Sequence, residues 1–205
     1  MKRDLLFFNV DTQKDFCQKN GKLYIKGAES IYPTLAKVTN AARVQDMVVV
    51  NTADFHTPDD IELSKTPDFI NTFPEHCMVG TEGCNFIDET NFHKFGCDPY
   101  YISNYDEELD KEELMKCRNI IIYKNKFDVF EGNKNTEAII KELNPKMIMV
   151  YGVATNVCVN AAVIGLATRG HKVTVIGNAI KELPNISIDS ILEKWYRLGV
   201  NIKFI

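Results

Sequence analysis

The chain has 205 residues, of which 45% are hydrophobic, so it is long enough to bury the core of a single domain. Charged residues make up 25% and the net charge is −4, with lysines and arginines scattered along the chain, which argues against a nucleic-acid partner. The first apolar run is broken by Asp4 and ends at Asp11, which is too short for a signal peptide or a membrane span, so we expect a cytoplasmic protein with no membrane partner.

Short apolar runs rich in branched residues alternate along the chain with helix-like segments. The runs predict buried strands at residues 5–10, 47–52, 120–123, 147–152, 172–177 and 201–205. The segments between them predict helices at about residues 29–43, 106–117, 134–143, 156–169 and 187–198, two of which end at Asn144–Pro145 and at Gly170. The alternation predicts one α/β domain over residues 1–205, an open, doubly wound, mostly parallel six-stranded sheet with helices on both faces, as in Rossmann-like folds.

Reactive side chains follow several of the predicted strands. The first strand ends in Asp11, the second runs into Asp54 and His56, Lys124 follows the third, and the turn after the fourth opens a helix with Cys158. In an open parallel sheet, ligands bind beyond the carboxyl ends of the strands. We therefore expect a carboxylate, a metal-type pair, an amine and a thiol to meet at one rim of the sheet.

Cys158 is one of six cysteines, which show no regular spacing and should be reduced thiols. It lies in the first turn of a predicted helix, where unpaired backbone amides and the helix dipole stabilise a thiolate. Those amides, with the bend at Val153–Ala154, could donate to an oxyanion formed when the thiolate attacks a carbonyl. The alternative interpretation is a buried structural cysteine.

Asp11 and Lys124 are the candidates for a proton shuttle and for a cation that stabilises the thiolate. Asp11 stands at a strand end beside a polar turn, and the alternative interpretation is that it is an ordinary turn residue. Asp15 is a nearby competitor for its role. Lys124 would ordinarily extend to solvent, and Lys126 is its competitor. A buried Lys124 would instead stabilise the thiolate and a developing oxyanion.

The stretch from residue 53 to about residue 105 is irregular and far longer than an ordinary connection, which is typical of a functional loop. Asp54 and His56 are two apart in an extended segment and should point the same way, and His76 could complete a metal site. Two imidazoles and a carboxylate suit a catalytic zinc, iron or manganese ion. Other candidates in this stretch are His93 as an alternative third ligand, the less suited Cys77, and Glu62 or Asp60 as a fourth ligand.

Three motifs together resemble the isochorismatase-like cysteine hydrolases. Residues 11–16 match the family's D-x-Q-x-D-F motif, and residues 152–159 match its G-x-x-T-x-x-C-V motif. Lys124 precedes Phe130 by six positions, as the family's lysine precedes an aromatic residue, which favours Lys124 over Lys126. The resemblance implies a catalytic triad of Asp11, Lys124 and Cys158. It also implies a non-proline cis peptide at Val153–Ala154 that aims backbone amides at the oxyanion.

Within that family the chain resembles the nicotinamidase branch, which carries D-x-H followed by P-x-H-C-x-x-G-T. Residues 54–56 and 74–81 match both patterns, within a metal-binding loop region at about 53–84, and favour His76 over His93. The resemblance implies that the metal holds a pyridine nitrogen while Phe16 and Phe73 pack against the ring. Two departures are Phe73, where tryptophan is frequent, and Asp128–Val129, where small residues are commoner.

The implied function is metal-dependent conversion of nicotinamide to nicotinate and ammonia through a thioester, as part of NAD salvage. The implied cofactor is one divalent ion, zinc with iron or manganese as alternatives, and the implied partners are a small amide substrate and a second copy of the chain. One rival keeps the chemistry but takes another amide, ureide or carbamoyl substrate, and another is a non-catalytic metal-binding module. A phosphohydrolase with Asp11 as nucleophile is disfavoured, because Gln13 occupies the position of the second aspartate.

Overall fold

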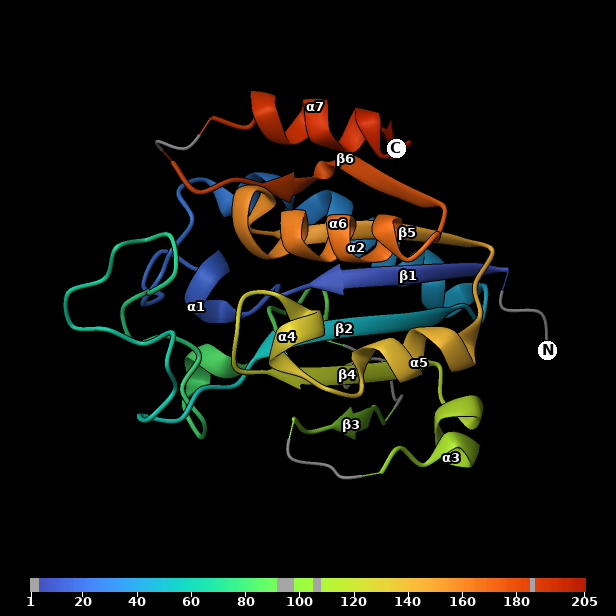
Figure 1. Cartoon of the computed structure of the whole chain (residues 1–205), viewed down its shortest axis with the longest axis horizontal. Helices are drawn as coiled ribbons and strands as arrows, with labels where there is room; N and C mark the ends of the chain where they lie inside the picture. Colours follow the sequence, from blue (N-terminus) through green and yellow to red (C-terminus); the bar gives the residue numbers. More distant parts are fainter. Residues whose placement is uncertain (1–3, 92–97, 105–107, 185–186) are drawn as a thin grey trace.

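One parallel sheet organises the computed structural model, which describes residues 4–91, 98–104, 108–184 and 187–205 (Figure 1). Its seven strands lie in the order β3-β4-β2-β1-β5-β6-β7, and each neighbouring pair is parallel. The strands are β1 (Leu5–Val10), β2 (Val48–Asp54), β3 (Tyr100–Ile102), β4 (Asn119–Lys124), β5 (Met147–Val153), β6 (Val173–Lys181) and β7 (Asn201–Lys203). Strands β2, β4 and β3 lie on one side of β1 and strands β5, β6 and β7 on the other, so the predicted doubly wound sheet is confirmed.

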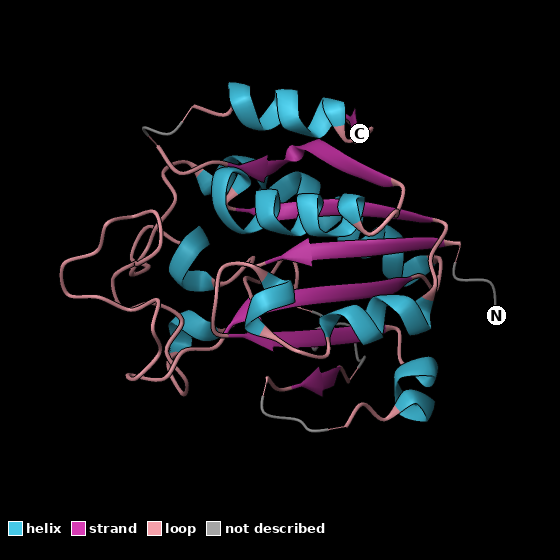
Figure 2. Ribbon diagram, viewed as in Figure 1, coloured by secondary structure: helices cyan, strands magenta, loops and turns pink. Residues whose placement is uncertain are grey.

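Helices cover both faces of the sheet, because alternate side chains of the buried strands point to opposite sides (Figure 2). Leu6 and Phe8 of β1 belong to one apolar cluster and Phe7 belongs to the other. The first cluster packs under α3 (Lys111–Lys116), α4 (Val129–Gly132), α5 (Thr136–Leu143), α6 (Asn160–Thr168) and α7 (Asp189–Arg197). The second packs under α1 (Lys14–Cys17), the 3-10 helix η1 (Ala28–Ile31) and α2 (Tyr32–Val44). Two further turns are the 3-10 helix η2 (Glu82–Cys84) and the π-helical turn η4 (Thr155–Val159).

The expected count of six strands was wrong, because the sequence pattern missed β3. This strand has three residues at the edge of the sheet and buries only Ile102, so it leaves no extended apolar run. The terminal strand β7 was expected to be buried, but its three residues are exposed at the opposite edge. The short helices α1 and α4 were also missed, since four residues are too few to show a helical period.

Two helix ends agree with the sequence pattern, and one glycine shows a close approach of two strands that the pattern did not predict. Asn144 and Gly170 both adopt the left-handed conformation, with φ of 43° and 85°, at the ends of α5 and α6. Gly152, with φ of 120°, lies so close to β1 that an added Cβ would come within 2.0 Å of the carbonyl oxygen of Val10. Only glycine fits there, and this close approach brings the end of β5 against the end of β1. Among the described helices, none is long and apolar enough to cross a membrane.

Candidate active site

Four adjacent strands carry the candidate catalytic residues to one rim of the sheet. Asp11 directly follows β1, Asp54 and Lys124 are the last residues of β2 and β4, and Cys158 lies in η4 just after β5. These strands are neighbours in the order β4-β2-β1-β5. The side chains therefore meet beyond the carboxyl ends of the strands, as expected for an open parallel sheet.

Lys124 lies between two carboxylates and is buried, with 1% of its surface exposed, so it does not extend to solvent. Its Nζ lies 2.9 Å from Oδ2 of Asp11 and also forms an ion pair with Oδ1 of Asp54. The other oxygen of Asp11 accepts a 2.5 Å hydrogen bond from the hydroxyl of Thr52. Sγ of Cys158 and carboxylate oxygens of Asp11 and Asp54 all lie within 4.8 Å of one another. A thiol, an acid and a cation thus share one small buried volume.

The pKa values of this group reflect burial opposed by ion pairing. Burial raises the pKa of the Cys158 thiol well above its ordinary value, although Lys124 acts in the opposite direction. Burial also raises the pKa of Asp11, again against the effect of Lys124. Burial alone would lower the pKa of Lys124, but Asp11 and Asp54 outweigh it and hold that pKa well above its usual range. Burial thus raises the proton affinity of both the thiol and the acid beside it, and their proximity suits proton transfer between them.

The surroundings of Cys158, more than its thiol pKa, distinguish it from the other cysteines. Burial raises the thiol pKa of Cys17, Cys77 and Cys84 as well. Among Cys17, Cys77, Cys84 and Cys158, only Cys158 has Lys124 among the groups that lower its thiol pKa. Of the other two cysteines, Cys117 is half-buried and Cys97 lies outside the described residues.

A second group of buried side chains lies directly beside the first and has the composition of a metal site. One ligand atom from each of Asp54, His56 and His76 lies within 4.8 Å of the others. Nδ1 of His76 donates to the carbonyl oxygen of Pro74 at 2.7 Å, and Nδ1 of His56 lies 3.2 Å from Oδ2 of Asp60. Both imidazoles therefore present Nε2 to Asp54, at 3.3 Å for His76 and 3.9 Å for His56.

These three residues fit a divalent ion. Nε2 of His56 is buried and has no hydrogen-bond partner, so this nitrogen is available as a metal ligand. Two imidazoles and one carboxylate leave coordination positions open for a substrate, as in catalytic metal sites. A second group with ligand-type atoms, formed by Asp11, Asp54 and Cys158, already contains the ammonium group of Lys124 between its two carboxylates. The geometry thus favours the histidine-containing group for a metal.

The other proposed ligands have different positions. Glu62 lines the same pocket as Asp54 and His76, but it is not part of the compact ligand group, and its Oε1 accepts a 2.8 Å hydrogen bond from the amide of Phe127. Burial raises the pKa of the Glu62 carboxyl to about 7. Asp60 orients His56 from behind, as described above. Cys77 is not in the ligand group either, and His93 lies outside the described residues.

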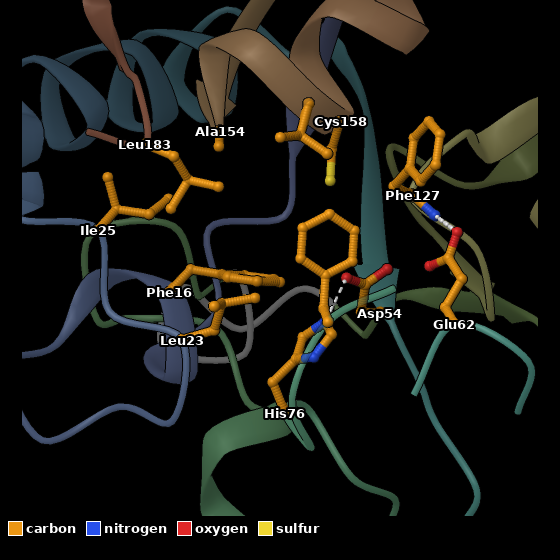
Figure 3. A pocket seen from close by; sticks show the side chains of 12 residues that line it. Phe16, Leu23, Ile25, Asp54, Glu62, His76, Phe127, Ala154, Cys158 and Leu183 are labelled. Atoms are coloured by element: carbon orange, nitrogen blue, oxygen red, sulfur yellow. Dashed lines mark hydrogen bonds and ion pairs between the residues drawn. The ribbon is translucent and has the colours of Figure 1, made fainter. Parts of the chain in front are cut away.

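A pocket opens onto both groups and divides into a polar side and an apolar side (Figure 3). Asp54, His76 and Cys158 point into it, and Glu62 and Phe127 form one margin. The opposite wall is apolar and consists of Phe16, Leu23, Ile25, Ala154, Val157 and Leu183. Phe73 completes the twelve lining residues.

Both aromatic residues expected at the substrate line this pocket, next to the metal-type histidine. The ring centroid of Phe16 lies 5.2 Å from that of His76, and the centroid of Phe73 lies 6.2 Å from it. The wall residues Leu23, Ile25 and Leu183 were not anticipated, because single apolar residues in irregular segments carry no periodic signal. The peptide bond between Val153 and Ala154 is cis, as the sequence resemblance implied.

Comparisons with known proteins agree with this geometry. The profile of the isochorismatase domain matches residues 103–187. A nicotinamidase/pyrazinamidase of Mycobacterium tuberculosis is 28% identical over 169 residues, which cover 78% of this chain and 80% of that protein. A zinc complex of Pyrococcus horikoshii pyrazinamidase has a similar fold, with a TM-score of 0.74 and 21% identity over 98% of this chain and 99% of that one. N-carbamoylsarcosine amidase of Thermoplasma acidophilum also matches, with a TM-score of 0.72 and 20% identity over 100% of this chain and 96% of that one.

Proposed function

We propose that this chain, which is similar to isochorismatase-like hydrolases, is a metal-dependent cysteine amidohydrolase that converts nicotinamide to nicotinate and ammonia. The observation that carries the proposal is one pocket shared by two groups. The first is Cys158 with the buried Asp11 and Lys124, and the second is Asp54, His56 and His76, which we call the metal-type group. A nucleophile and a metal-type group that line one pocket suit an amide whose ring also offers a metal ligand. The similarity to a nicotinamidase/pyrazinamidase points the same way.

In the proposed mechanism, Asp11 accepts the proton of the Cys158 thiol while the sulfur attacks the amide carbon. The tetrahedral intermediate collapses as Asp11 returns the proton to the departing nitrogen, so ammonia leaves and a thioester to Cys158 remains. A water molecule then loses a proton to Asp11 and attacks the thioester, which releases the carboxylic acid and restores the thiol. Lys124 stabilises the negative charge that develops in both halves of the reaction.

The metal-type group has a separate role in this proposal. A divalent ion held by Asp54, His56 and His76 would supply a Lewis acid for the ring nitrogen of the substrate. Phe16 and Phe73 flank His76, where they would pack against the ring and exclude water. Orientation of the ring would place the amide carbon at the sulfur of Cys158.

The lining of the pocket favours a neutral amide over a substrate with a carboxylate. The twelve described lining residues include the acidic Asp54 and Glu62 but no lysine or arginine. A carboxylate that enters such a pocket loses its hydration and finds no cationic side chain among the lining residues. This feature separates nicotinamide from N-carbamoyl amino acids, the kind of substrate named for one of the structural relatives.

A substrate panel tests this choice directly. We expect ammonia release from nicotinamide to exceed release from N-carbamoylsarcosine by ~100-fold or more in kcat/KM, because the lining offers the second substrate's carboxylate no lysine or arginine. Benzamide, which lacks the ring nitrogen, should fall between them. A carbamoyl substrate cleaved faster than nicotinamide would overturn the assignment of nicotinamide but keep the cysteine chemistry.

Loss of the metal should abolish nicotinamide turnover without unfolding the protein. Replacement His76→Ala removes one of three ligands, and we expect kcat/KM to fall roughly 100-fold or more, since a Lewis acid contributes several kcal/mol. His171→Ala is the matched control, because His171 lies after α6 and outside the pocket. Metal content and activity are measured for both variants, and for wild type before and after chelation. Full activity in metal-free wild type would contradict the metal requirement.

A further inference from the structure

Two polar residues at α1, Gln13 and Asp15, hold the main chain at the metal-type residues without belonging to that group. Gln13 is fully buried, with 0% of its surface exposed, and Asp15 is 6% exposed. Both belong to the D-x-Q-x-D-F motif, but neither has a part in the proposed reaction. We refer to these two side chains as the α1 clamp.

Gln13 replaces a missing strand neighbour beside Asp54. Strand β1 pairs with β2 only as far as Val10, which lies opposite Thr52, so no residue of β1 pairs with Asp54. At Asp54 the side chain of Gln13 takes over: its Oε1 accepts from the amide of Asp54 at 2.7 Å, and its Nε2 donates to the carbonyl of Asp54 at 2.8 Å. On the other side Asp54 pairs with Lys124 of β4. The main chain of Asp54 is therefore held from both sides, which directs its carboxylate between Lys124 and His76.

The remaining N–H of Gln13 donates to the end of the metal-binding loop region, at about residue 84. Nε2 also donates to the carbonyl of Cys84 at 2.8 Å, so the carboxamide uses one acceptor and two donors. Both of its N–H donors and its oxygen bind the backbone at Asp54 and Cys84, on either side of the segment that carries His56 and His76. A side chain with this pattern positions its partners by hydrogen-bond geometry.

Asp15 binds the same loop region at Cys77. Its Oδ2 accepts from the amide of Cys77 at 2.7 Å, directly after His76. The carbonyl of Cys77 in turn accepts from the amide of His56 at 3.1 Å, so one carboxylate fixes the segments of both histidines. Gly83 admits the carboxylate, because an added Cβ at this glycine would lie 2.2 Å from the Asp15 carboxyl group.

We propose that the α1 clamp positions Asp54, His56 and His76 for the metal and couples their loop to the strand that carries Asp11. Gln13 and Asp15 are positioning residues, since they act through the main chain of the ligand residues. This inference rests on the metal site of the proposed function, but it does not depend on which amide is the substrate.

The test measures Zn²⁺ affinity by competition with a chromophoric chelator, and thiol alkylation of Cys158, in purified full-length variants. In Gln13→Glu the new carboxylate faces the carbonyl oxygens of Asp54 and Cys84 in place of a donor. In Asp15→Asn an amide NH₂ group competes for the position that accepts from Cys77. We expect each change to weaken Zn²⁺ binding by roughly 10–100-fold, the range for residues that orient metal ligands. Alkylation of Cys158 should remain at the wild-type rate.

Asn51→Asp is the matched control. Asn51 is also a buried amide that donates twice, to Asn119 at 2.7 Å and to the carbonyl of Ile120 at 3.1 Å, and accepts once, from Asn9 at 2.9 Å. None of these hydrogen bonds involves the loop, so the control should lose thermal stability as Gln13→Glu does but keep wild-type Zn²⁺ affinity. If Gln13→Glu does not fold, Asp15→Asn compared with the same control decides.

Two results would count against the inference and differ from each other. Wild-type Zn²⁺ affinity in folded Gln13→Glu and Asp15→Asn, or an equal loss of affinity in Asn51→Asp, would overturn the clamp and leave the proposed function intact. A wild-type protein that binds no divalent ion would instead contradict the metal site of the proposed function.

Discussion

Replacement of Cys158 by alanine is expected to lower nicotinamide turnover by ~10⁴-fold or more, because covalent catalysis loses its only nucleophile. The side chain is small and buried, and it is not part of the metal-type group, so metal content should remain at the wild-type level. Ammonia release and metal content are measured on the same preparation. Mass spectrometry of wild type quenched during turnover should show an acyl group on Cys158.

Cys117→Ala provides the matched control for this change. Cys117 is a half-buried thiol at the end of α3 and does not line the pocket. The control should retain wild-type turnover. Appreciable turnover by Cys158→Ala, or an acyl adduct on another cysteine, would contradict the covalent mechanism.

Replacement of Lys124 by methionine is expected to cost about 3–5 kcal/mol of stability and to abolish activity, because it leaves two buried carboxylates without their cation. Asp11 and Asp54 are 0% and 2% exposed, so water cannot replace the ammonium group. The free energy of unfolding is measured by urea denaturation in the presence of a chelator, so that no metal ion offsets the charge of Asp54.

The neighbouring Lys126→Met is the control for the loss of a lysine. Its side chain is 39% exposed and lies 3.5 Å from Glu131, a surface ion pair that contributes about 0–1 kcal/mol. A Lys124→Met variant no less stable than Lys126→Met would show that the buried ion pairs do not stabilise the fold.

The stability loss in Lys124→Met should also depend on pH. Burial already raises the pKa of Asp11, and removal of Lys124 removes the main influence that lowers it. A carboxyl whose pKa is raised on folding stabilises the folded state when protonated, and that contribution is lost as the pH rises through the folded pKa. The difference between variant and wild type should therefore be smaller at pH 5 than at pH 8. A difference that shrinks as the pH rises would contradict this interpretation of Asp11.

Local sequence patterns were sufficient to predict the main strands and the rim of the sheet to which they bring the candidate residues. A buried parallel strand has a continuous apolar run as its sequence pattern. The residue after the run lies at the carboxyl edge of the sheet, independently of the rest of the chain. Asp11, Asp54 and Lys124 could be placed in this way, and their meeting point follows from the strand order. The edge strand β3 could not, since three partly exposed residues have no pattern of their own.

The amino-acid sequence by itself determined the doubly wound α/β architecture and the set of residue types available at the rim, because both depend on local periodicity and on motifs within a few residues. Only the tertiary structure decided what those residues do to one another. Lys124 is buried because Asp11 and Asp54, far away in the chain, surround it with negative charge. Asp15 serves as a backbone acceptor for Cys77, and Leu23 and Leu183 become walls of one pocket, because folding brings together segments whose separation along the chain carries no local signal.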